Sequence, residues 1–399
     1  MTHEGSAAAD LTAENLFNDP YPVYARLRRE SPVQHFAPTG EILVTRWKEC
    51  FTVGTKDSIF VPSDSSLRPE ARVMGLPNIL SLSGPPHAAL RKGIDANLTA
   101  PAVARYAEEL VRPIARQYVE ALRAQGSADL TKDLFEPISV RVVATVLGLS
   151  HVENPTLVRW FHALNGGLQN VANDPAVWAV CDAARAEIDS VVRPIIERVT
   201  REPDDSIISH MVHGGLPAGE ARSFDELMPT IRVTLLGGLQ EPGHGAANAV
   251  YGLLSNPEQS ALVQQDPPRH AQAAYDEGLR WIAPIGVTPR LASEEFELAG
   301  TVIPKGSSVA IVLASANRDE SRYEHSEQFR LDREPLPHAA FGYRRHVCSG
   351  QHLSRVIGRV SIQETYRLLP NLRLDPRREV VTKGWRFRGV MNLPAEWDA

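Results

Sequence analysis

The chain has 399 residues, of which 43% are hydrophobic, so it can bury a large core. Its 42 basic and 48 acidic side chains give a formal net charge of -6, which argues against nucleic acid as a partner. The three cysteines, Cys50, Cys181 and Cys348, are widely spaced and form no CxxC pair, so we expect neither a disulfide framework nor a zinc site. No stretch approaches about 18 uninterrupted apolar residues, and we therefore expect a cytoplasmic protein without a membrane partner.

Residues 1–19 are polar, and we expect them to form a flexible N-terminal segment, whereas no repeat or linker divides residues 20–399, which we expect to form a single domain. Apolar periodicity predicts helices over residues 102–125, 140–147, 155–171, 175–199, 224–254 and 257–281. Short β-rich runs predict strands over residues 41–45, 288–291, 301–303, 308–313 and 386–391. The expected fold class is therefore mainly α with small β-sheets.

A final helix is predicted from near Gly350 to about Leu369, which places Cys348 just before a helix N-terminus. Unpaired amides and the positive end of the helix dipole stabilise a thiolate at such a position and lower the pKa of the thiol. A thiolate is a metal ligand, so Cys348 is a candidate for more than a buried structural role.

The segment around Cys348 resembles the cysteine loop of the cytochrome P450 family, whose pattern is Phe-Gly-x-Gly-x-His/Arg-x-Cys-x-Gly. The residues that match this pattern are Phe341, Gly342, His346, Cys348 and Gly350. Arg344 stands where the family has glycine, so either the turn is altered or Arg344 adopts a strained conformation.

Further motifs extend the resemblance over nearly the entire chain. Glu277-x-x-Arg280 is similar to the family's charged pair, residues 84–91 to its haem-facing helix start, and residues 388–394 to its terminal turn. The resemblance implies the cytochrome P450 fold, with a long central helix over the haem and the cysteine loop beneath it. Glu277 and Arg280, with Arg318 nearby, are expected to form a buried ion network that braces this loop.

The resemblance also implies a haem b cofactor with Cys348 as the axial ligand of its iron. The amide of Gly350 is expected to point at the sulfur, and Phe341 to pack beneath the macrocycle. Haem propionates need cationic or hydrogen-bonding partners. The residues that the resemblance assigns to them are His87, Arg91, Arg290 and His346.

Residues 233–243 resemble the helix that passes over the distal face of the haem, where the family carries an acid followed by threonine. Counting back from Pro257 places Gln240 at the acid position and Glu241 at the threonine position, as candidate catalytic residues. A shifted alignment would put Glu241 at the acid position and Pro242 at the alcohol position. In either register the alcohol is absent, and Pro242 is expected to kink the helix and free the carbonyl of Gly238.

The resemblance implies a monooxygenase that inserts one oxygen atom from O2 into a small hydrophobic organic molecule by hydroxylation or oxidative dealkylation. Two alternatives stay open: a hydrogen-peroxide-dependent peroxygenase that uses Glu241, and a non-catalytic haem-binding sensor or carrier. The pocket is expected to be covered by residues 68–82 and 157–180. Its lining is expected to come from Val233, Leu236, Gly237, Gly286, Val287, Val390 and Met391.

The sequence carries no flavin, nicotinamide or iron-sulfur motif, so electrons are expected from a separate ferredoxin or flavodoxin-type donor with its reductase. Basic residues around the cysteine loop are candidates for a docking face that attracts an acidic donor. These residues are Lys92, Arg344, Arg345, Arg355 and Arg359.

Overall fold

A computed structural model describes residues 10–63, 69–170 and 172–399. The fold is mainly α with small sheets, as the sequence predicts, and within the described residues no helix is long and apolar enough to cross a membrane. The α-helices are α1 Ala13–Asn18, α2 Tyr21–Glu30, α3 Trp47–Thr55, α4 Pro69–Met74, α5 Gly84–Asp95, α6 Ala100–Tyr106, α7 Arg112–Arg123, α8 Glu136–Leu147, α9 Asn154–Leu168, α10 Pro175–Arg201, α11 Ile207–His213, α12 Phe224–Leu239, α13 Glu241–Leu254, α14 Pro257–Gln265, α15 Pro267–Trp281, α16 Leu313–Ala316 and α17 Gln351–Leu368.

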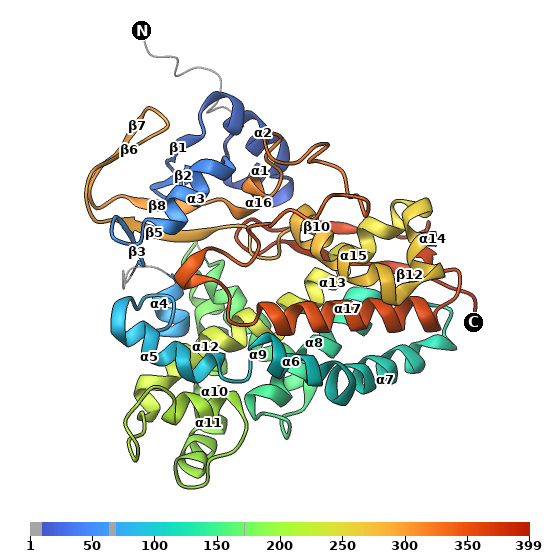
Figure 1. Ribbon diagram of the computed structural model, residues 1–399, viewed down its shortest axis with the longest axis horizontal. Coiled ribbons are helices and arrows are strands. Elements are labelled where there is room, and N and C mark those ends of the chain that lie inside the picture. The colour runs from blue at the N-terminus through green and yellow to red at the C-terminus, as the bar shows by residue number, and fades with distance from the viewer. Residues whose placement is uncertain (1–9, 64–68, 171) are drawn as a thin grey trace.

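Short helical segments of other kinds join these elements: the π-helical turns η1 Ala107–Val111 and η2 Thr131–Phe135, and the 3-10 turn η3 Arg344–His346. The largest sheet has the strand order β1-β2-β8-β5-β3, and in Figure 1 it lies to one side of the helical mass. Its strands are β1 Val33–Phe36, β2 Glu41–Val44, β3 Phe60–Val61, β5 Thr288–Ala292 and β8 Ser308–Ile311.

The remaining sheets are small. β10 Val381–Lys383 pairs with β11 Gly389–Asn392, and β6 Phe296–Leu298 pairs with β7 Thr301–Ile303. β12 Pro394–Glu396 lies between β4 Ser127–Asp129 and β9 Arg373–Leu374, so the C-terminal end of the chain is tied to the start of η2.

Two long predicted helices are each divided in the structure. The helix expected over residues 224–254 breaks at Gln240, two residues before Pro242, and forms α12 and α13. The helix expected over residues 257–281 ends before Asp266, whose carboxylate accepts from the amide of Arg269 and so caps a new helix that starts at Pro267. Proline explains both divisions, because it lacks the amide that a continuous helix requires.

The N-terminal prediction needs a correction. Residues 1–9 lie outside the described residues, but part of the segment expected to be flexible folds into α1, which is capped by the side chain of Thr12. Leu16 is fully buried and Leu11 is almost so, in a core that also contains Leu43 of β2. Burial of these leucines favours order in this segment, and sequence polarity alone did not indicate it.

Helices α13, α15 and α17 form a tightly packed group that supports the cysteine loop. A Cβ atom on Gly358 of α17 would lie 1.9 Å from the ring of Tyr275 of α15, so only glycine fits where these helices cross. The hydroxyl of Tyr275 in turn lies 2.7 Å from that of Ser354 and donates to the carbonyl of Pro242, 3.3 Å away. One buried tyrosine therefore links the helix after Cys348 to the helix that begins at the break.

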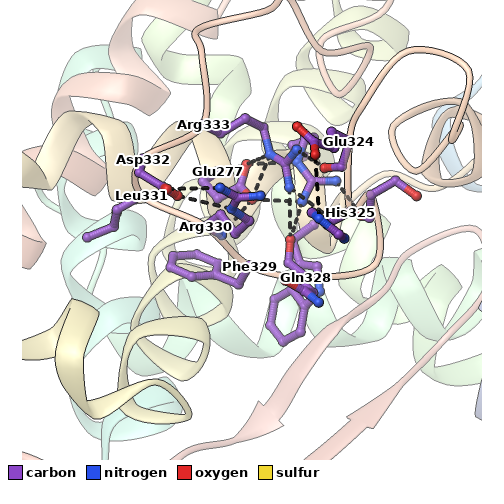
Figure 2. Close-up of polar contacts among 12 residues, drawn as sticks. Glu277, Glu324, His325, Gln328, Phe329, Arg330, Leu331, Asp332 and Arg333 are labelled. Atoms are coloured by element: carbon purple, nitrogen blue, oxygen red, sulfur yellow. Dashed lines mark hydrogen bonds and ion pairs between the residues drawn. The ribbon is translucent and has the colours of Figure 1, made fainter.

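Glu277 of α15 is the centre of a buried ion network (Figure 2). Arg280 donates to both of its carboxylate oxygens at 2.7 Å, and Arg333 donates to the same oxygens at 3.2 and 3.3 Å. Arg280 also binds the carbonyls of residues 317, 326 and 328, which fixes the segment leading to the cysteine loop. The expected third member, Arg318, instead donates to the carbonyl of Trp281 and stacks on Tyr21, because its position carries it away from Glu277.

We predict that Glu277→Ala lowers the free energy of unfolding by about 3–5 kcal/mol, because it leaves the guanidinium groups of Arg280 and Arg333 buried without their carboxylate. Chemical denaturation followed by circular dichroism measures the loss. Glu324→Ala is the matched control, since Glu324 is 84% exposed in the same part of the fold. Equal stability of the two variants would contradict a bracing role for the network.

Candidate functional site

The cysteine loop is held by backbone hydrogen bonds and by one arginine. The amide of Cys348 donates to the carbonyl of Phe341 at 2.8 Å, and α17 begins three residues after the cysteine. Arg91 of α5 donates to the carbonyl of Val347 at 2.8 Å and pairs with Asp95 at 2.9 Å. Arg91 therefore holds the loop against α5, a role that sequence reasoning did not assign to it.

Arg344, which stands where the family pattern has glycine, has a strained backbone conformation. Arg344 has φ +44°, in the left-handed region, and Gly342 before it has φ +74°. The chain therefore keeps a left-handed turn at Arg344 rather than altering it, at a cost of roughly 1–3 kcal/mol for a residue other than glycine.

The three cysteines differ sharply in exposure, since Cys50 and Cys181 are buried and Cys348 is exposed. The thiol of Cys348 is nevertheless desolvated, and this raises its pKa, although the amide of Gly350 and the charges of Arg91 and Arg355 act in the opposite direction. The expectation that the helix terminus lowers the pKa is thus wrong for the protein by itself, because desolvation outweighs the dipole.

Three nitrogen-bearing side chains gather beside this loop with no carboxylate bonded to them in the described part of the chain. The rings of His87 and His346 lie 4.6 Å apart, and Nε2 of His87 has no hydrogen-bond partner. Arg290 of β5 is 6% exposed, and its Nε atom is also unpartnered. Desolvation and the charge of Arg290, followed by those of His87 and Arg91, lower the pKa of His346 to about 3. The cluster therefore suits an anionic ligand.

Phe341 lies within the loop as expected, between the side chains of Arg355 and His338. Arg355 of α17 stacks over its ring, with the guanidinium carbon 4.5 Å from the ring centroid, and the ring of His338 lies 5.7 Å away. Arg355 also pairs with Asp276 at 2.9 Å. The side chain of Arg355 is therefore held by contacts within the fold. Three other residues of the expected docking face, Arg344, Arg345 and Lys92, are exposed.

One face of α12, in the central helix, is only partly covered by neighbouring residues. Val233 is half-buried, and Gly237, one turn later, is exposed, with no atom within 4 Å of where its Cβ would be. Glu241, the first residue of α13 after the break, is 8% exposed, and neither of its carboxylate oxygens has a hydrogen-bond partner in the described part of the chain. Desolvation alone raises the pKa of Glu241 to about 8. Gln240, by contrast, is 3% exposed and lies against α8.

The other residues expected to line a pocket differ in how much surface they present. Leu236, Gly286 and Val287 are buried, and Val390 has no exposed surface. Met391 is 44% exposed. Residues 69–82, the described part of the first covering segment, contact α12: the amide of Ile79 donates to the hydroxyl of Thr230, and Arg232 donates to the carbonyl of Met74 at the end of α4. Arg68 of this segment and Val171 of the second lie outside the described residues.

Sequence reasoning missed three titratable residues near the break: Glu136, His162 and His244. Glu136 begins α8, and its carboxylate lies 3.2 Å from Nε2 of His162. His244 follows Gln240 by one turn, and burial lowers its pKa to about 4. The spacing of Gln240 and His244 was the one available signal, because residues four apart share a helix face.

Comparisons with known proteins identify the family of the chain. The family model for cytochrome P450 matches residues 270–383. The chain is 30% identical to the mycinamicin IV hydroxylase/epoxidase of Micromonospora griseorubida, over 94% of each chain, and 29% identical to the cytochrome P450 monooxygenase PikC of Streptomyces venezuelae, over 99% of this chain and 97% of that one. The crystal structure of P450BioI with an acyl carrier protein superposes with a TM-score of 0.86, at 22% identity, over 97% of this chain and all of that one.

These likenesses confirm the enzyme interpretation over that of a non-catalytic sensor or carrier. They imply a cysteine-ligated haem iron, a small-molecule substrate, O2 and redox partners. The chain belongs to the cytochrome P450 family and is an oxidoreductase of the monooxygenase type.

Proposed function

We propose that Cys348 is the axial ligand of a haem b and that the enzyme oxidises a small hydrophobic organic molecule by hydroxylation or oxidative dealkylation. The observation that carries this proposal is the accessible, desolvated thiol of Cys348 just before α17. A bound metal cation would favour the thiolate over the thiol and so offset the desolvation that raises its pKa. The amide of Gly350, which already acts on the sulfur, would stabilise the same charge.

The residues around Cys348 fit the rest of a haem. Its two propionates would bind His87, His346 and Arg290, whose nitrogen atoms are gathered together without an acidic partner. Phe341 would pack beneath the macrocycle and limit access of water to the sulfur. Arg91 would act on the haem mainly through the loop backbone that it holds, since its bonds go to Asp95 and Val347.

When bound, the haem supplies the activation of O2 and the transfer of one oxygen atom. The chain supplies shape and protons. Val233 and Gly237 would leave room for a compact substrate over the haem, and α4 and α9 would exclude water from above. The carboxyl of Glu241 would hold a proton on the same face of the helix and release it to the reacting oxygen.

Electrons would come from a separate ferredoxin or flavodoxin-type donor with its reductase. Lys92, Arg344 and Arg345 present exposed positive charge near the cysteine loop, which suits an acidic donor. Arg359 is half-buried and Arg355 is paired with Asp276, so we assign both smaller parts in docking. We further propose that residues 20–399 act as one haem domain.

A peroxygenase activity is the second candidate, and one observation favours it. Glu241 is a buried carboxyl without a hydrogen-bond partner among the described residues. In the register counted back from Pro257, it takes the position where the family has threonine. A carboxylate can accept a proton from hydrogen peroxide and return it to the departing oxygen, whereas a hydroxyl is a much weaker base.

We predict that Cys348→Ser abolishes the ferrous carbon-monoxide absorption that thiolate-ligated haem gives, because a serine hydroxyl is mostly protonated and a poor ligand. Cys50→Ser and Cys181→Ser are the matched controls and should keep the spectrum, since both thiols are buried elsewhere. A thiolate-type spectrum in Cys348→Ser would exclude Cys348 as the ligand.

We predict that His87→Ala and Arg290→Ala each weaken haem retention by roughly 1.5–3 kcal/mol, the value of a hydrogen bond to a charged group. Transfer of haem to an excess of apomyoglobin measures the rate of loss. Arg345→Ala is the control, because Arg345 is a cation of the same loop whose side chain is 72% exposed. Loss rates equal to that of the wild type in both variants would remove these residues from the haem site.

We predict that peroxide-driven oxidation rises with pH through about 8, because Glu241 becomes a base only when its raised pKa is passed. Below that pH the carboxyl is protonated and the rate falls. Glu241→Gln keeps the shape and should lose at least about tenfold of the high-pH rate, together with the pH dependence. The comparison needs wild type, Glu241→Gln and Glu241→Thr at equal haem content, and a Gln variant that follows the wild-type profile would exclude Glu241.

A further inference from the structure

Phe51 is an aromatic side chain that is exposed beside the cysteine loop. It lies on α3, is 46% exposed, and meets the ring of Tyr343 edge-on, with the two ring centroids 5.9 Å apart. Tyr343 also meets Trp47 edge-on at 6.2 Å, and a Cβ atom on Gly54 would lie 2.3 Å from its ring. Residues 47, 51 and 54 share one face of α3, so Tyr343 packs along this helix and Phe51 stands at the edge of that contact.

Packing within the fold explains only the inner part of the contact. Tyr343 is buried, whereas nearly half of the surface of Phe51 remains exposed. A single exposed apolar residue is ordinary on a protein surface and by itself indicates nothing. The exposed ring of Phe51 gains significance from the residue that follows Tyr343 in the loop.

That residue, Arg344, has a strained backbone without an internal contact that accounts for it. Main-chain bonds hold the turn: the amide of His346 donates to the carbonyl of Tyr343 at 3.2 Å, and that of Val347 donates to the carbonyl of Arg344 at 3.0 Å. Glycine would make the same bonds without strain at φ +44°. The exposed side chain of Arg344 forms no ion pair and no hydrogen bond with the described residues, so nothing in that part of the chain requires an arginine here.

The charge around Phe51 is mainly positive. Lys48 lies one turn before Phe51 on α3 and is exposed, whereas Glu49 is 8% exposed and presents little of its charge at the surface. Arg345 has a 72% exposed side chain and pairs with Asp57 at 3.5 Å. Positive charges at the edge of an exposed aromatic ring are complementary to a partner whose acidic residues surround an apolar centre.

We propose that Phe51 and Arg344 form a docking point for an acidic ferredoxin, a proposal that rests on the proposed function of the surface around the cysteine loop. Phe51 packs against apolar atoms of the ferredoxin, and Arg344 pairs with its carboxylates. Aromatic and arginine side chains contribute most of the binding free energy in many protein interfaces. The strain at Arg344 then accompanies the presentation of its charge to the partner.

The test measures the dissociation constant of the ferric haem protein for an oxidised, acidic plant-type 2Fe-2S ferredoxin. Calorimetry at about 0.05 M and about 0.3 M NaCl separates screened from unscreened contributions without any turnover. The variants are Phe51→Ala, Arg344→Gln and Arg344→Gly. The matched controls are Leu262→Ala, at a 45% exposed residue of α14, and Arg123→Gln, at an exposed residue that ends α7. Figure 1 shows α7 and α14 on the side of the molecule away from α3.

We expect Phe51→Ala to weaken ferredoxin binding at least about tenfold at both salt concentrations, because salt does not screen an apolar contact. Arg344→Gln should weaken binding about fivefold at low salt and less at high salt, because salt screens exposed charges. Both controls should stay within about twofold of wild type. If Phe51→Ala binds as tightly as Leu262→Ala, Phe51 is no anchor and the docking point is overturned.

Arg344→Gly separates docking from folding. Glycine relieves the left-handed strain, so the midpoint of thermal unfolding should rise by about 1–3 °C while ferredoxin binding weakens as it does in Arg344→Gln. A purely structural role for Arg344 would instead lower stability in this variant. Arg344→Gly also keeps the proposal open to refutation if Phe51→Ala disturbs the packing of Tyr343, because wild-type affinity in Arg344→Gly overturns the docking point.

The same measurements distinguish failure of the docking point from failure of the proposed donor. If wild type binds the ferredoxin and the variants at Phe51 and Arg344 bind it equally tightly, the donor stands and the docking point fails. If wild type binds neither this ferredoxin nor a flavodoxin, the proposed donor fails, and the docking point fails with it. If only flavodoxin binding depends on Phe51 and Arg344, the assignment of the surface to a ferredoxin is overturned.

Discussion

Desolvation is the physical constraint on which the site depends. It raises the pKa of the Cys348 thiol, raises that of Glu241 to about 8 and is the largest cause that lowers that of His346 to about 3. In each case the interior favours the neutral form, because a charge loses its hydration there. A metal cation at the sulfur and an anion beside His346 would each restore the charged form. Binding of a charged cofactor would therefore act against these pKa shifts of Cys348 and His346.

Proline and glycine decide where the ionisable groups stand. Pro242 ends the hydrogen-bonded run of α12, so Gln240 adopts φ -109° and ψ -32° and the helix restarts at Glu241. Gly243 then brings α13 against α8, and Gly237 leaves the opposite face open. Two consecutive residues consequently face different surroundings: Gln240 lies beside the carboxyl of Glu136, and the carboxyl of Glu241 has no hydrogen-bond partner in the described part of the chain.

Local signals made the cysteine loop and most helices predictable. The Phe341–Gly350 pattern, the helix that follows it and the effect of Pro242 all depend on residues close together in sequence. Contacts over long sequence separations were not predictable. Nothing local distinguishes Arg333, which binds Glu277, from Arg318, which does not, because packing alone brings one arginine to the carboxylate.

The same reasoning explains why Glu136 and His162 escaped notice. Each lies on a helix whose sequence has no distinguishing feature. Only the tertiary structure brings the two side chains together, near the break in the central helix. Arg91 shows the converse, since its family position suggested a haem contact, whereas its bonds go to Asp95 and Val347. A motif predicts which residues belong to the haem site, and the tertiary contacts show which of their donors are already bonded within the protein.

In the register that places Glu241 at the threonine position, a carboxyl would stand at the break where the family has an alcohol. A hydroxyl can pass a proton but hardly binds an extra one, whereas a carboxyl with a pKa of about 8 stores a proton at neutral pH. If the carboxyl gives its proton to the reacting oxygen, as we propose for the monooxygenase, the store must be refilled from solvent. Glu241 has no hydrogen-bond partner of its own, and the nearest titratable residue in sequence, His244, has its pKa lowered to about 4 and is a poor proton donor. Refilling would therefore require a group beyond the central helix, because a proton donor has to be ionisable near neutral pH.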